Sequence, residues 1–387
     1  MSHVLMVGVG AHGHTNPHLP VVAELVERGH RVSYAIPAPF AEAVAATGAD
    51  PLVITSTLPD ETRDEQWPTD PVTGMGLFLD DAVLVLPQLE AALADDRPDV
   101  VLYDIGGYAG RALAHRWGVP LVQLSPSIVA WEGYEEDMAE ALAFLREPDG
   151  IAYAERFDGW LRGLGIDMPW TEFSGRPPRC VVLVPKVMQP HADRVDESVY
   201  TFVGPGLDRR REAAWPEPDR PLLLVSLGSA YTDRVDFYRD CVAAFGDLDR
   251  RVVIAIGRHV DPVAVGPVPP NVELHPWVPQ FAVLARASAF VTHAGMGGCS
   301  EGLYQGVPMV AVPQAVDQPG NAAMLEALGV GVTVPPESVT PAVLRDAVLS
   351  LIGSPEVAAR SAALRDELRA AGGARAAADV VEAQLPR

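Results

Sequence analysis

The stretch from Gly204 to Arg220, GPGLDRRREAAWPEPDR, divides the chain into two halves with the same organisation. It is rich in proline, glycine and charge and has no periodicity, which is typical of a linker. On each side of it, short apolar runs alternate with segments of helical spacing, as a parallel sheet covered by helices on both faces requires. We therefore predict two doubly wound α/β domains, residues 1–203 and 221–370, joined by the linker 204–220 and followed by a C-terminal helix, 371–387, that could pack back on the N-terminal domain.

Composition excludes several kinds of partner. The formal net charge of −22 disfavours nucleic acid and anionic membranes, because both would be repelled. No uninterrupted apolar run approaches the roughly 18 residues of a membrane span, and the glycine-broken run Val4–Val9 is unlike a signal peptide. The cysteines, Cys180, Cys241 and Cys299, indicate neither a disulfide framework nor a zinc site. We expect a cytoplasmic protein without stable membrane insertion, and its oligomeric state, a homodimer included, is open.

The first glycine-rich loop follows the first apolar run. Gly8, Gly10 and Gly13 spell GxGxxG, a pattern that can bring a pyrophosphate to a helix N-terminus. A dinucleotide fold would also carry an acidic residue at the end of the next strand, but the run Arg31–Ile36 is followed by proline and alanine. NAD binding is therefore only a minor alternative.

The same loop carries two histidines just ahead of the expected helix Asn16–Arg28. We expect Asn16 to cap this helix, Pro17 to lie in its first turn and Gly29 to end it. A histidine at the carboxyl edge of the sheet can take a proton from a hydroxyl group, provided that a partner fixes its tautomer. We assign this role to His14. The alternative, a structural role in the turn, suits His12 better.

Asp104 is the candidate partner of His14. It directly follows the apolar run Val100–Tyr103, so it is expected at the same carboxyl edge of the same sheet.

The second glycine-rich segment, AFVTHAGMGGCSEG from Ala289, predicts a strand, a tight turn and a helix that begins near Gly297. Gly295, Gly297 and Gly298 would let the backbone approach a ligand, and the amides at the helix start would form an anion site. His293 can add a donor. Such a site supplies positive potential without lysine or arginine, which an acidic protein needs in order to hold a phosphate.

Residues near this segment suit the nucleoside of a nucleotide. Glu301, about one helical turn further on, suits a pair of ribose hydroxyls; the alternative is a charge that merely favours the start of the helix. Trp277, at the expected end of a strand, can stack on a base, and Val278 or Gln280 can read the base edge or the ribose. Structural packing is the alternative for Trp277.

Two further loops should face the same ligand. Ser229 follows the first strand of the second domain, where hydroxyls and amides suit a phosphate. Asp317 and Gln318 follow the apolar run Met309–Pro313 and suit the hydroxyls of a sugar attached to the nucleotide.

Apolar segments of the N-terminal half could form an acceptor pocket or ordinary core. They lie around residues 75–78, 125–134 and 138–145, and the candidate contacts are Phe78, Ser127 and Trp131.

The motifs WVPQ, HAGMGGCSEG and GVP, followed by Asp317 and Gln318, resemble the nucleotide-sugar signature of the UDP-glycosyltransferase superfamily. AHGHTNP, YAIP, DDRPDVVLYDI, RWGVP, LVQLSPS and QPHADRVDESVYTFVGP resemble the macrolide-inactivating, oleandomycin-type glycosyltransferases over almost the whole chain. This resemblance implies a GT-B fold, in which two Rossmann-like domains face a central cleft. It also implies inverting transfer without metal or cofactor, with UDP-glucose as donor and a macrolide or a similar apolar, hydroxylated compound, such as a phenol, as acceptor.

The resemblance also implies residue roles. The base of the family falls on His14 and its partner on Asp104. The implied donor contacts are Trp277 with uracil, His293, Gly298 and Ser229 with the diphosphate, Glu301 with the ribose, and Asp317 and Gln318 with glucose. Plant members carry tryptophan and asparagine where this chain has Met296 and Gly297, so their side-chain sugar contacts do not carry over.

Other functions compete with transfer. Metal-dependent transferases commonly use an acidic DxD pair, and Asp247 with Asp249 matches it literally, but the pair lies between a helix and a strand start and is interpreted as a solvated turn. A sugar-nucleotide epimerase or hydrolase would need acid and base groups facing the sugar. A non-catalytic nucleotide-sugar-binding partner of another transferase would not need His14. UDP is favoured over dTDP, because a carboxylate at Glu301 loses one hydrogen bond with a deoxyribose.

Overall fold

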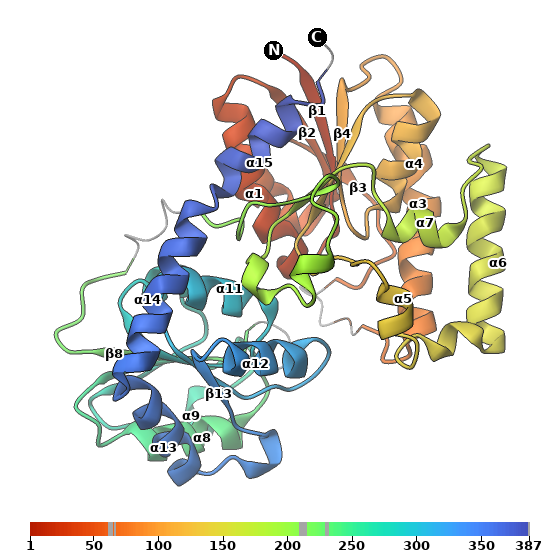
Figure 1. The fold of residues 1–387 in the computed structure, drawn as a ribbon. Helices are drawn as coiled ribbons and strands as arrows, with labels where there is room; N and C mark the ends of the chain where they lie inside the picture. The colour runs from red at the N-terminus through yellow and green to blue at the C-terminus, as the bar shows by residue number, and fades with distance from the viewer. Residues whose placement is uncertain (61–64, 66, 209–214, 229–231, 386–387) are drawn as a thin grey trace. The chain divides into compact units, whose positions relative to one another are not determined.

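The computed structural model describes residues 1–60, 65, 67–208, 215–228 and 232–385. The chain forms two compact units, of which the first combines residues 1–207 with 372–387 and the second covers 208–371 (Figure 1). The passage from the first unit to the second therefore falls within the expected linker, 204–220.

The first unit is built on a seven-stranded sheet in which every neighbouring pair is parallel. In spatial order its strands are β3 (Asp50–Ile54), β2 (Arg31–Pro37), β1 (His3–Val7), β4 (Val100–Asp104), β5 (Leu121–Ser125), β6 (Cys180–Val182) and β7 (Tyr200–Phe202). The strand order reverses between β1 and β4. Open α/β sheets bind ligands at such a point, outside the carboxyl ends of the strands.

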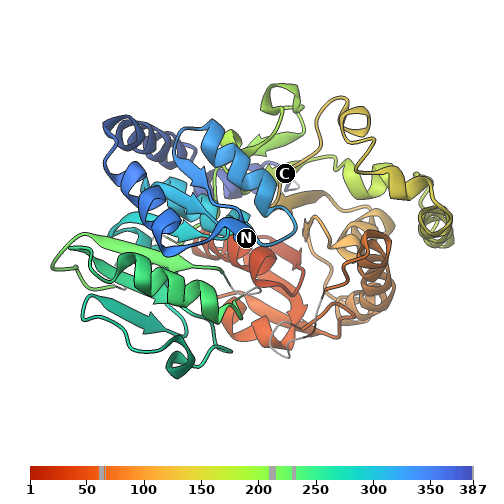
Figure 2. The same ribbon diagram turned by 90° about the horizontal axis from the view of Figure 1, so that it is seen from below.

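Helices cover both faces of this sheet (Figure 2). Successive side chains of β1 point to opposite faces: Val4 and Met6 join one buried cluster, and Leu5 and Val7 join another. Both faces are therefore apolar, which explains why these strands read as continuous apolar runs. The helices of the unit are α1 (His12–Glu27), α2 (Ala41–Ala45), α3 (Pro71–Ala92), α4 (Tyr108–Trp117), α5 (Tyr134–Asp137), α6 (Pro148–Gly163), α7 (Trp170–Gly175) and α15 (Gly373–Glu382).

Helix α1 begins four residues earlier than the sequence suggested. It starts at His12 and not after Asn16, and the amides of His14 and Thr15 already donate to the carbonyl of Ala11, at 3.1 and 2.8 Å. The prediction of an Asn16 cap was wrong, because the capping position falls on Ala11, which has no capping side chain, while Pro17 lies inside the helix. Proline cannot donate to the carbonyl four residues earlier. The predicted end of the helix is confirmed, since Gly29 takes a left-handed conformation with φ +89°.

The C-terminal helix α15 packs on α1 (Figure 1). Arg28 bridges Asp379 and Glu382 at 2.6 and 2.7 Å, and His30 lies 3.0 Å from Glu382. Ala377, Ala378 and Val381 are buried in the cluster that also contains the apolar side chains of α1.

Among the described residues, α3 is the one helix long and apolar enough to cross a membrane by length and composition. Its Leu79, Leu86 and Leu89 are buried in the core of the first unit, and Asp80 and Asp81 interrupt its sequence.

The second unit repeats the plan with a six-stranded parallel sheet. Its strands, in spatial order, are β10 (Val272–His275), β9 (Arg251–Ala255), β8 (Leu222–Ser226), β11 (Ala287–Thr292), β12 (Met309–Ala311) and β13 (Gly331–Thr333). Its helices are α8 (Val235–Phe245), α9 (Pro262–Val265), α10 (Gln280–Leu284), α11 (Met296–Gln305), α12 (Gln318–Ala327), α13 (Pro341–Ile352) and α14 (Pro355–Ala370). Here the strand order reverses between β8 and β11.

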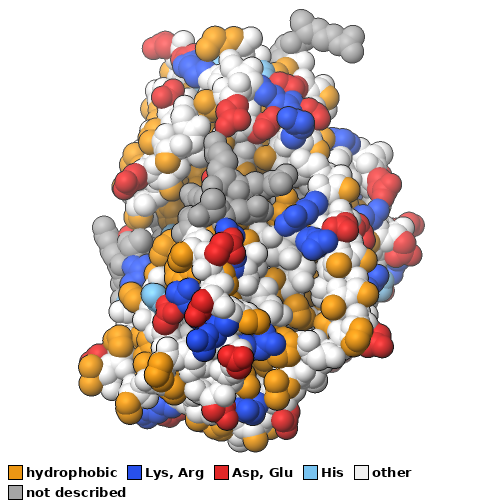
Figure 3. Space-filling view, turned by 90° about the vertical axis from the view of Figure 1, so that its left-hand side faces the viewer, with side chains coloured by type: hydrophobic (Ala, Val, Ile, Leu, Met, Phe, Trp, Pro, Cys, Tyr) orange, Lys and Arg blue, Asp and Glu red, His pale blue; other side chains and the backbone are white. Residues whose placement is uncertain are grey.

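Charges of both signs are mixed on the face of the molecule in Figure 3, where the described lysines and arginines lie among aspartates and glutamates.

Candidate active site

His14 and Asp104 meet at the reversal point of the first sheet. His14 lies in the first turn of α1, which follows β1, and Asp104 is the last residue of the neighbouring strand β4. Nδ1 of His14 is 3.0 and 2.9 Å from the two carboxylate oxygens of Asp104. The Asp104 side chain is fully buried, whereas 29% of the His14 side chain is exposed. The predicted pair is thus in contact, with the histidine as its accessible member.

Asp104 is held in its ionised form. Burial by itself would raise the pKa of this carboxyl, but His14, His18 and the amide of Gly106 together keep the pKa below its ordinary value. The Gly106 amide donates to Oδ1 at 2.8 Å. An ionised carboxylate only accepts hydrogen bonds, so Nδ1 of His14 must carry the proton of that bond.

His18 is a member of the site that the sequence reasoning missed. It lies one helical turn beyond His14 on α1, is fully buried, and places Nε2 3.4 Å from Oδ2 of Asp104. Its Nδ1 is 3.3 Å from the hydroxyl of Tyr34 on β2. Burial lowers the pKa of His18 to about 4, so this imidazole is neutral at pH 7. His14 and His18 are four residues apart, which places them on the same face of a helix. This signal would have been visible if the helix had been predicted to start at His12.

His12 packs against the ring of Phe40, with ring centroids 5.1 Å apart in an edge-on arrangement. Its side chain therefore helps to shape the loop.

Phe78 lies beside Gly106, whose amide donates to Asp104. A Cβ atom on Gly106 would come within 2.7 Å of its ring, and the ring stacks on Trp67 at 5.7 Å. Phe78 and Trp67 pack on a small apolar cluster that includes Val9 and Ala11 of the loop between β1 and α1. An apolar cluster thus adjoins the loop that precedes His14.

The other two acceptor candidates belong to the segment after β5. Trp131 is buried and donates from Nε1 to Asp137 at 2.7 Å, and its ring packs against Tyr134 and His191. The carbonyl of Ser127 accepts from the Ser125 hydroxyl at 2.9 Å. Trp131 is thus a packing residue of its own cluster.

The reversal point of the second sheet is occupied by His293, which follows β11. Its ring lies between two glycines: a Cβ atom would be 2.6 Å from the ring at Gly228, after β8, and 2.4 Å from it at Gly295. Burial lowers the pKa of His293 to about 4, so it is a neutral donor at pH 7. Ser229 lies outside the described residues.

Helix α11 starts directly after this turn, at Met296, with Gly295 as its N-cap. The first amides of a helix have no partner within it and present a partial positive charge. Gly297 is exposed and a Cβ atom there would meet open space, whereas Gly298 is buried next to Thr292. The helix start predicted near Gly297 is therefore confirmed, and Gly297 lies on its accessible side, while the binding of an anion there stays a prediction.

Asn321 is a second residue that the sequence reasoning missed. It donates to the carbonyl of Ala294 at 2.9 Å and to Oδ2 of Asp317 at 2.7 Å. Ala294 has the unusual φ of +62°, so Asn321 ties a strained residue of the glycine-rich turn to the carboxylate proposed for the sugar. The Oε1 atom of Gln318 accepts from the amides of Gln314 and Ala315 at 2.7 and 3.0 Å.

The structure also brings Gln280 and Glu301 together, because Nε2 of Gln280 donates to Oε2 of Glu301 at 2.7 Å. Trp277 lies two residues beyond the end of β10 and is 74% exposed, with its ring available for stacking, whereas Val278 is buried. Gln280 and Glu301 thus meet where α10 contacts α11, and Trp277 precedes α10 by three residues in the sequence.

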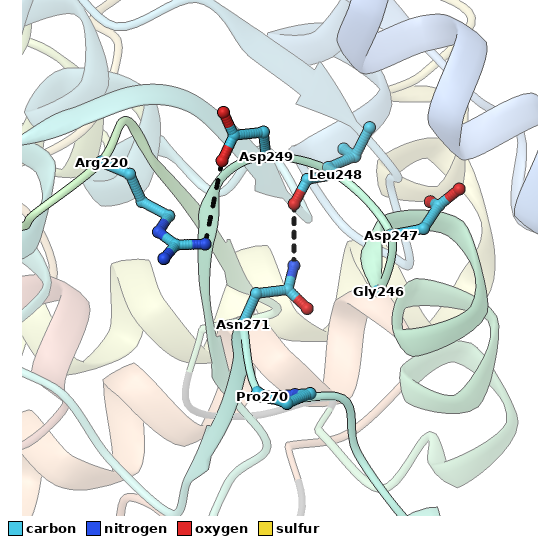
Figure 4. A pocket seen from close by; sticks show the side chains of 7 residues that line it. All are labelled: Arg220, Gly246, Asp247, Leu248, Asp249, Pro270 and Asn271. Atoms are coloured by element: carbon cyan, nitrogen blue, oxygen red, sulfur yellow. Dashed lines mark hydrogen bonds and ion pairs between the residues drawn. The ribbon is translucent and has the colours of Figure 1, made fainter.

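The DxD residues lie at the other edge of this sheet. Asp247 pairs with Arg345, and the fully exposed Asp249 lies 3.8 Å from Arg220. Arg220, Asp249 and Asn271 precede strands and line a surface hollow of about 380 Å³ (Figure 4). They therefore sit at the amino edge of the parallel strands, whereas His293 sits at the carboxyl edge. A second hollow, of about 670 Å³, is lined by residues 115–116 and 163–168 of the first unit.

Comparison with known proteins gives the same picture. Residues 239–383 match the family described as erythromycin biosynthesis protein CIII-like, C-terminal domain. The chain is 52% identical to the oleandomycin glycosyltransferase of Streptomyces antibioticus, over 100% of this chain and 91% of that protein. It is 36% identical to the NDP-glycosyltransferase YjiC of Bacillus licheniformis, over 99% of this chain and 98% of that protein.

Solved structures agree. The crystal structure of the glycotransferase of kitacinnamycin is 48% identical, with a TM-score of 0.92 over 100% of this chain and 99% of that one. The calicheamicin glycosyltransferase CalG4 is 34% identical, with a TM-score of 0.87 over 99% and 98% of the two chains. These relatives are named as glycosyltransferases and not as epimerases or accessory proteins. The chain therefore belongs to the UDP-glycosyltransferase superfamily and is a glycosyltransferase of the GT-B fold.

Proposed function

We propose that this enzyme moves glucose from UDP-glucose to a hydroxyl group of a macrolide or a similar apolar natural product, with inversion and without a metal or cofactor. One observation carries most of the weight: the buried, ionised Asp104 holds Nδ1 of the partly exposed His14. That arrangement is the one a general base needs, because the carboxylate fixes the tautomer and stabilises the imidazolium.

The proposed step is a single displacement. Nδ1 of His14 donates to Asp104, so the lone pair of the neutral ring is on Nε2. Nε2 takes the proton of the acceptor hydroxyl while the acceptor oxygen attacks the anomeric carbon. The bond between that carbon and the UDP oxygen breaks, the electron pair leaves with UDP, and the configuration inverts. Asp104 stabilises the positive charge that His14 gains.

The leaving diphosphate is assigned to the start of α11. The amides around Gly297 and Gly298, with the neutral His293 beside them, would stabilise the negative charge that develops on UDP. Ser229 is proposed for the same diphosphate on the basis of its sequence position. This cradle explains how an acidic protein can hold a diphosphate.

The nucleoside and the sugar are assigned to the neighbouring side chains. Trp277 would stack on uracil, and Glu301 with Gln280 would bind the ribose hydroxyls. Asp317 would accept from glucose hydroxyls. Gln318 would contribute its side-chain nitrogen, because its oxygen is already bound by loop amides.

Three observations support the acceptor class and the compartment. Phe78 and Trp67 form an apolar cluster with Val9 and Ala11 of the loop that precedes His14, which suits an apolar acceptor. The oleandomycin glycosyltransferase is among the relatives of this chain. All three cysteines are buried as free thiols, which suits the reducing cytoplasm that we propose.

The test is acceptor-dependent release of UDP. The enzyme is incubated with UDP-glucose and a panel of macrolides and phenols, and the anomeric configuration of each product is read from its NMR coupling constant. We expect UDP release that requires acceptor and a β-glucoside from the α-linked donor. Release that is independent of acceptor, or an α-glucoside as product, would overturn the proposal.

A further inference from the structure

His18 has no role in the proposed mechanism, although it lies on the same helix as His14. Asp104 lies between two histidines of α1: Oδ2 is 2.9 Å from Nδ1 of His14 and 3.4 Å from Nε2 of His18. His18 and Asp104 are both fully buried. Nε2 of His18 is buried without a hydrogen-bond partner, and the carboxylate 3.4 Å away is the charged group that it approaches. Its position needs an explanation, because burying an unpaired polar atom costs free energy.

The surroundings of His18 fix which of its ring nitrogens carries hydrogen. Asp104 is ionised and accepts only, so Nε2, which faces it, must be the protonated nitrogen. Nδ1 then accepts from the hydroxyl of Tyr34, at 3.3 Å. Burial raises the pKa of Tyr34 far above its ordinary value, so that hydroxyl keeps its proton and can donate.

The Tyr34 hydroxyl occupies a space that a glycine leaves open. A Cβ atom at Gly8 would come within 2.7 Å of it, so the glycine makes room for the phenol at this position. The result is a buried row of side chains in which Tyr34 donates to His18, Nε2 of His18 lies 3.4 Å from Asp104 without forming a hydrogen bond, and Asp104 accepts from His14.

The charge state of His18 matters for its use. Burial lowers the pKa of His18 to about 4, so the ring approaches Asp104 as a neutral dipole and not as a cation. A cation would cancel much of the carboxylate charge and weaken its stabilisation of a protonated His14. A neutral N–H orients the carboxylate and leaves its charge available.

We propose that His18 is a positioning residue for the base: through Nε2 it holds the Asp104 carboxylate in the orientation that fixes His14, and so sets the basicity of His14. The inference rests on the proposed function, in which His14 deprotonates the acceptor. His18 is buried and acts only through Asp104.

This role should appear in the pH dependence of the rate. The titratable groups around the Asp104 carboxylate are Tyr34 from β2, Tyr108 from α4, and His14 and His18 from α1. The N–H of His18 turns its positive end toward the carboxylate. If it is removed, the potential at His14 becomes more negative and the imidazolium is favoured. The acid limb of the kcat/KM profile, which reports the base of the free enzyme, then moves to higher pH.

The experiment compares His18→Leu, which removes the donor, with His18→Gln, whose amide nitrogen can still donate. We expect His18→Leu to lower kcat about fivefold and to move the acid limb upward by about half a pH unit. KM for UDP-glucose should stay within about twofold of wild type, because the donor residues belong to the second unit. His18→Gln should recover most of kcat and the wild-type acid limb.

A double variant asks whether His18 acts through His14. In the His14→Ala background, His18→Leu should cause no further loss, because there is no base left to position. His3→Leu is the matched control, since His3 is another buried imidazole of the first unit but lies at the amino end of β1. It should leave the acid limb where it is. Thermal melting of each variant separates loss of folding from loss of basicity.

Tyr34→Phe is a second variant that tests the same role if His18→Leu does not fold. It removes the hydroxyl that holds Nδ1 of His18, and should move the acid limb in the same direction by a smaller amount. An unchanged acid limb in the folded variants, or a full loss on adding His18→Leu to His14→Ala, would overturn the inference. Equal rates for wild type and His14→Ala would instead overturn the proposed function itself.

Discussion

Asp104 binds His14 through a single ring nitrogen, with both carboxylate oxygens within 3.0 Å of Nδ1. The contact joins the end of β4 to the first turn of α1. The two residues are 90 positions apart in the sequence, and they meet because β1, which leads into α1, is the neighbour of β4 in the sheet. The opposite nitrogen of His14 is thereby assigned to the acceptor, and the pair can be tested one partner at a time.

Asp104→Asn should leave the fold in place but lower kcat by about 10³-fold. An amide can donate to Nδ1 and so stabilise the wrong tautomer, and it carries no charge to balance the imidazolium. The measurement is kcat for UDP release at saturating acceptor, with the Kd for UDP as a check that the second unit still binds. A kcat within about threefold of wild type would contradict the role of Asp104.

Two histidines with lowered pKa values, His18 and His293, predict acid sensitivity. His18 and His293 have pKa values near 4 in the folded protein against 6.5 for the exposed ring, so the unfolded chain binds more protons between these values. Stability is therefore complete above about pH 6.5 and falls as the pH drops toward 4, by about 1.4 kcal/mol per pH unit for each histidine.

Melting temperatures between pH 7 and 4 test this. The fall should be shallower in His293→Gln, which has no group to titrate at that position. A variant that loses stability with the same pH dependence as wild type would show that His293 does not contribute.

Gly228→Ala should weaken UDP binding by about tenfold or more. Its Cβ atom would come within 2.6 Å of the His293 ring, at a position where φ is +78°, so the ring must move out of the diphosphate cradle. Gly329→Ala is the matched control: it has φ +70° and open space around its Cβ position. Titration calorimetry with UDP should show a loss for Gly228→Ala and near wild-type affinity for Gly329→Ala. If both variants bind UDP with equal affinity, His293 does not contribute to diphosphate binding.

Glu301→Gln should reduce the preference for UDP-glucose over dTDP-glucose. The carboxylate can accept from two ribose hydroxyls, whereas the amide oxygen offers a poorer acceptor and dTDP lacks one of the hydroxyls. We expect KM for UDP-glucose to rise about tenfold and KM for dTDP-glucose to change less. If kcat/KM falls by the same factor for both donors, Glu301 does not discriminate between ribose and deoxyribose.

The strands and the location of the site could be predicted from the sequence. Val4 and Met6 face one buried cluster and Leu5 and Val7 the other, so the strand shows as an uninterrupted apolar run. The carboxyl ends of such strands are where ligands bind, which was enough to pair His14 with Asp104. That contact is confirmed, while its role in catalysis stays a prediction.

What the sequence did not reveal depends on local geometry. Asn16 and Pro17 have the pattern of a helix start, and the real start at His12 has no capping side chain, so the turn that aligns His18 with His14 was not visible. Asn321 was missed for a similar reason. Its role follows from the left-handed conformation of Ala294, which could not be predicted because alanine rarely adopts that conformation.

The most direct test of the account is the acceptor-dependent rate of UDP release in His14→Ala, compared with wild type and His12→Ala. Loss of the base should lower kcat by about 10²-fold to 10⁴-fold, with little change in the Kd for UDP, while His12→Ala should retain most of its activity. Equal rates in wild type and His14→Ala, with both proteins folded, would contradict the assignment of His14 as the base.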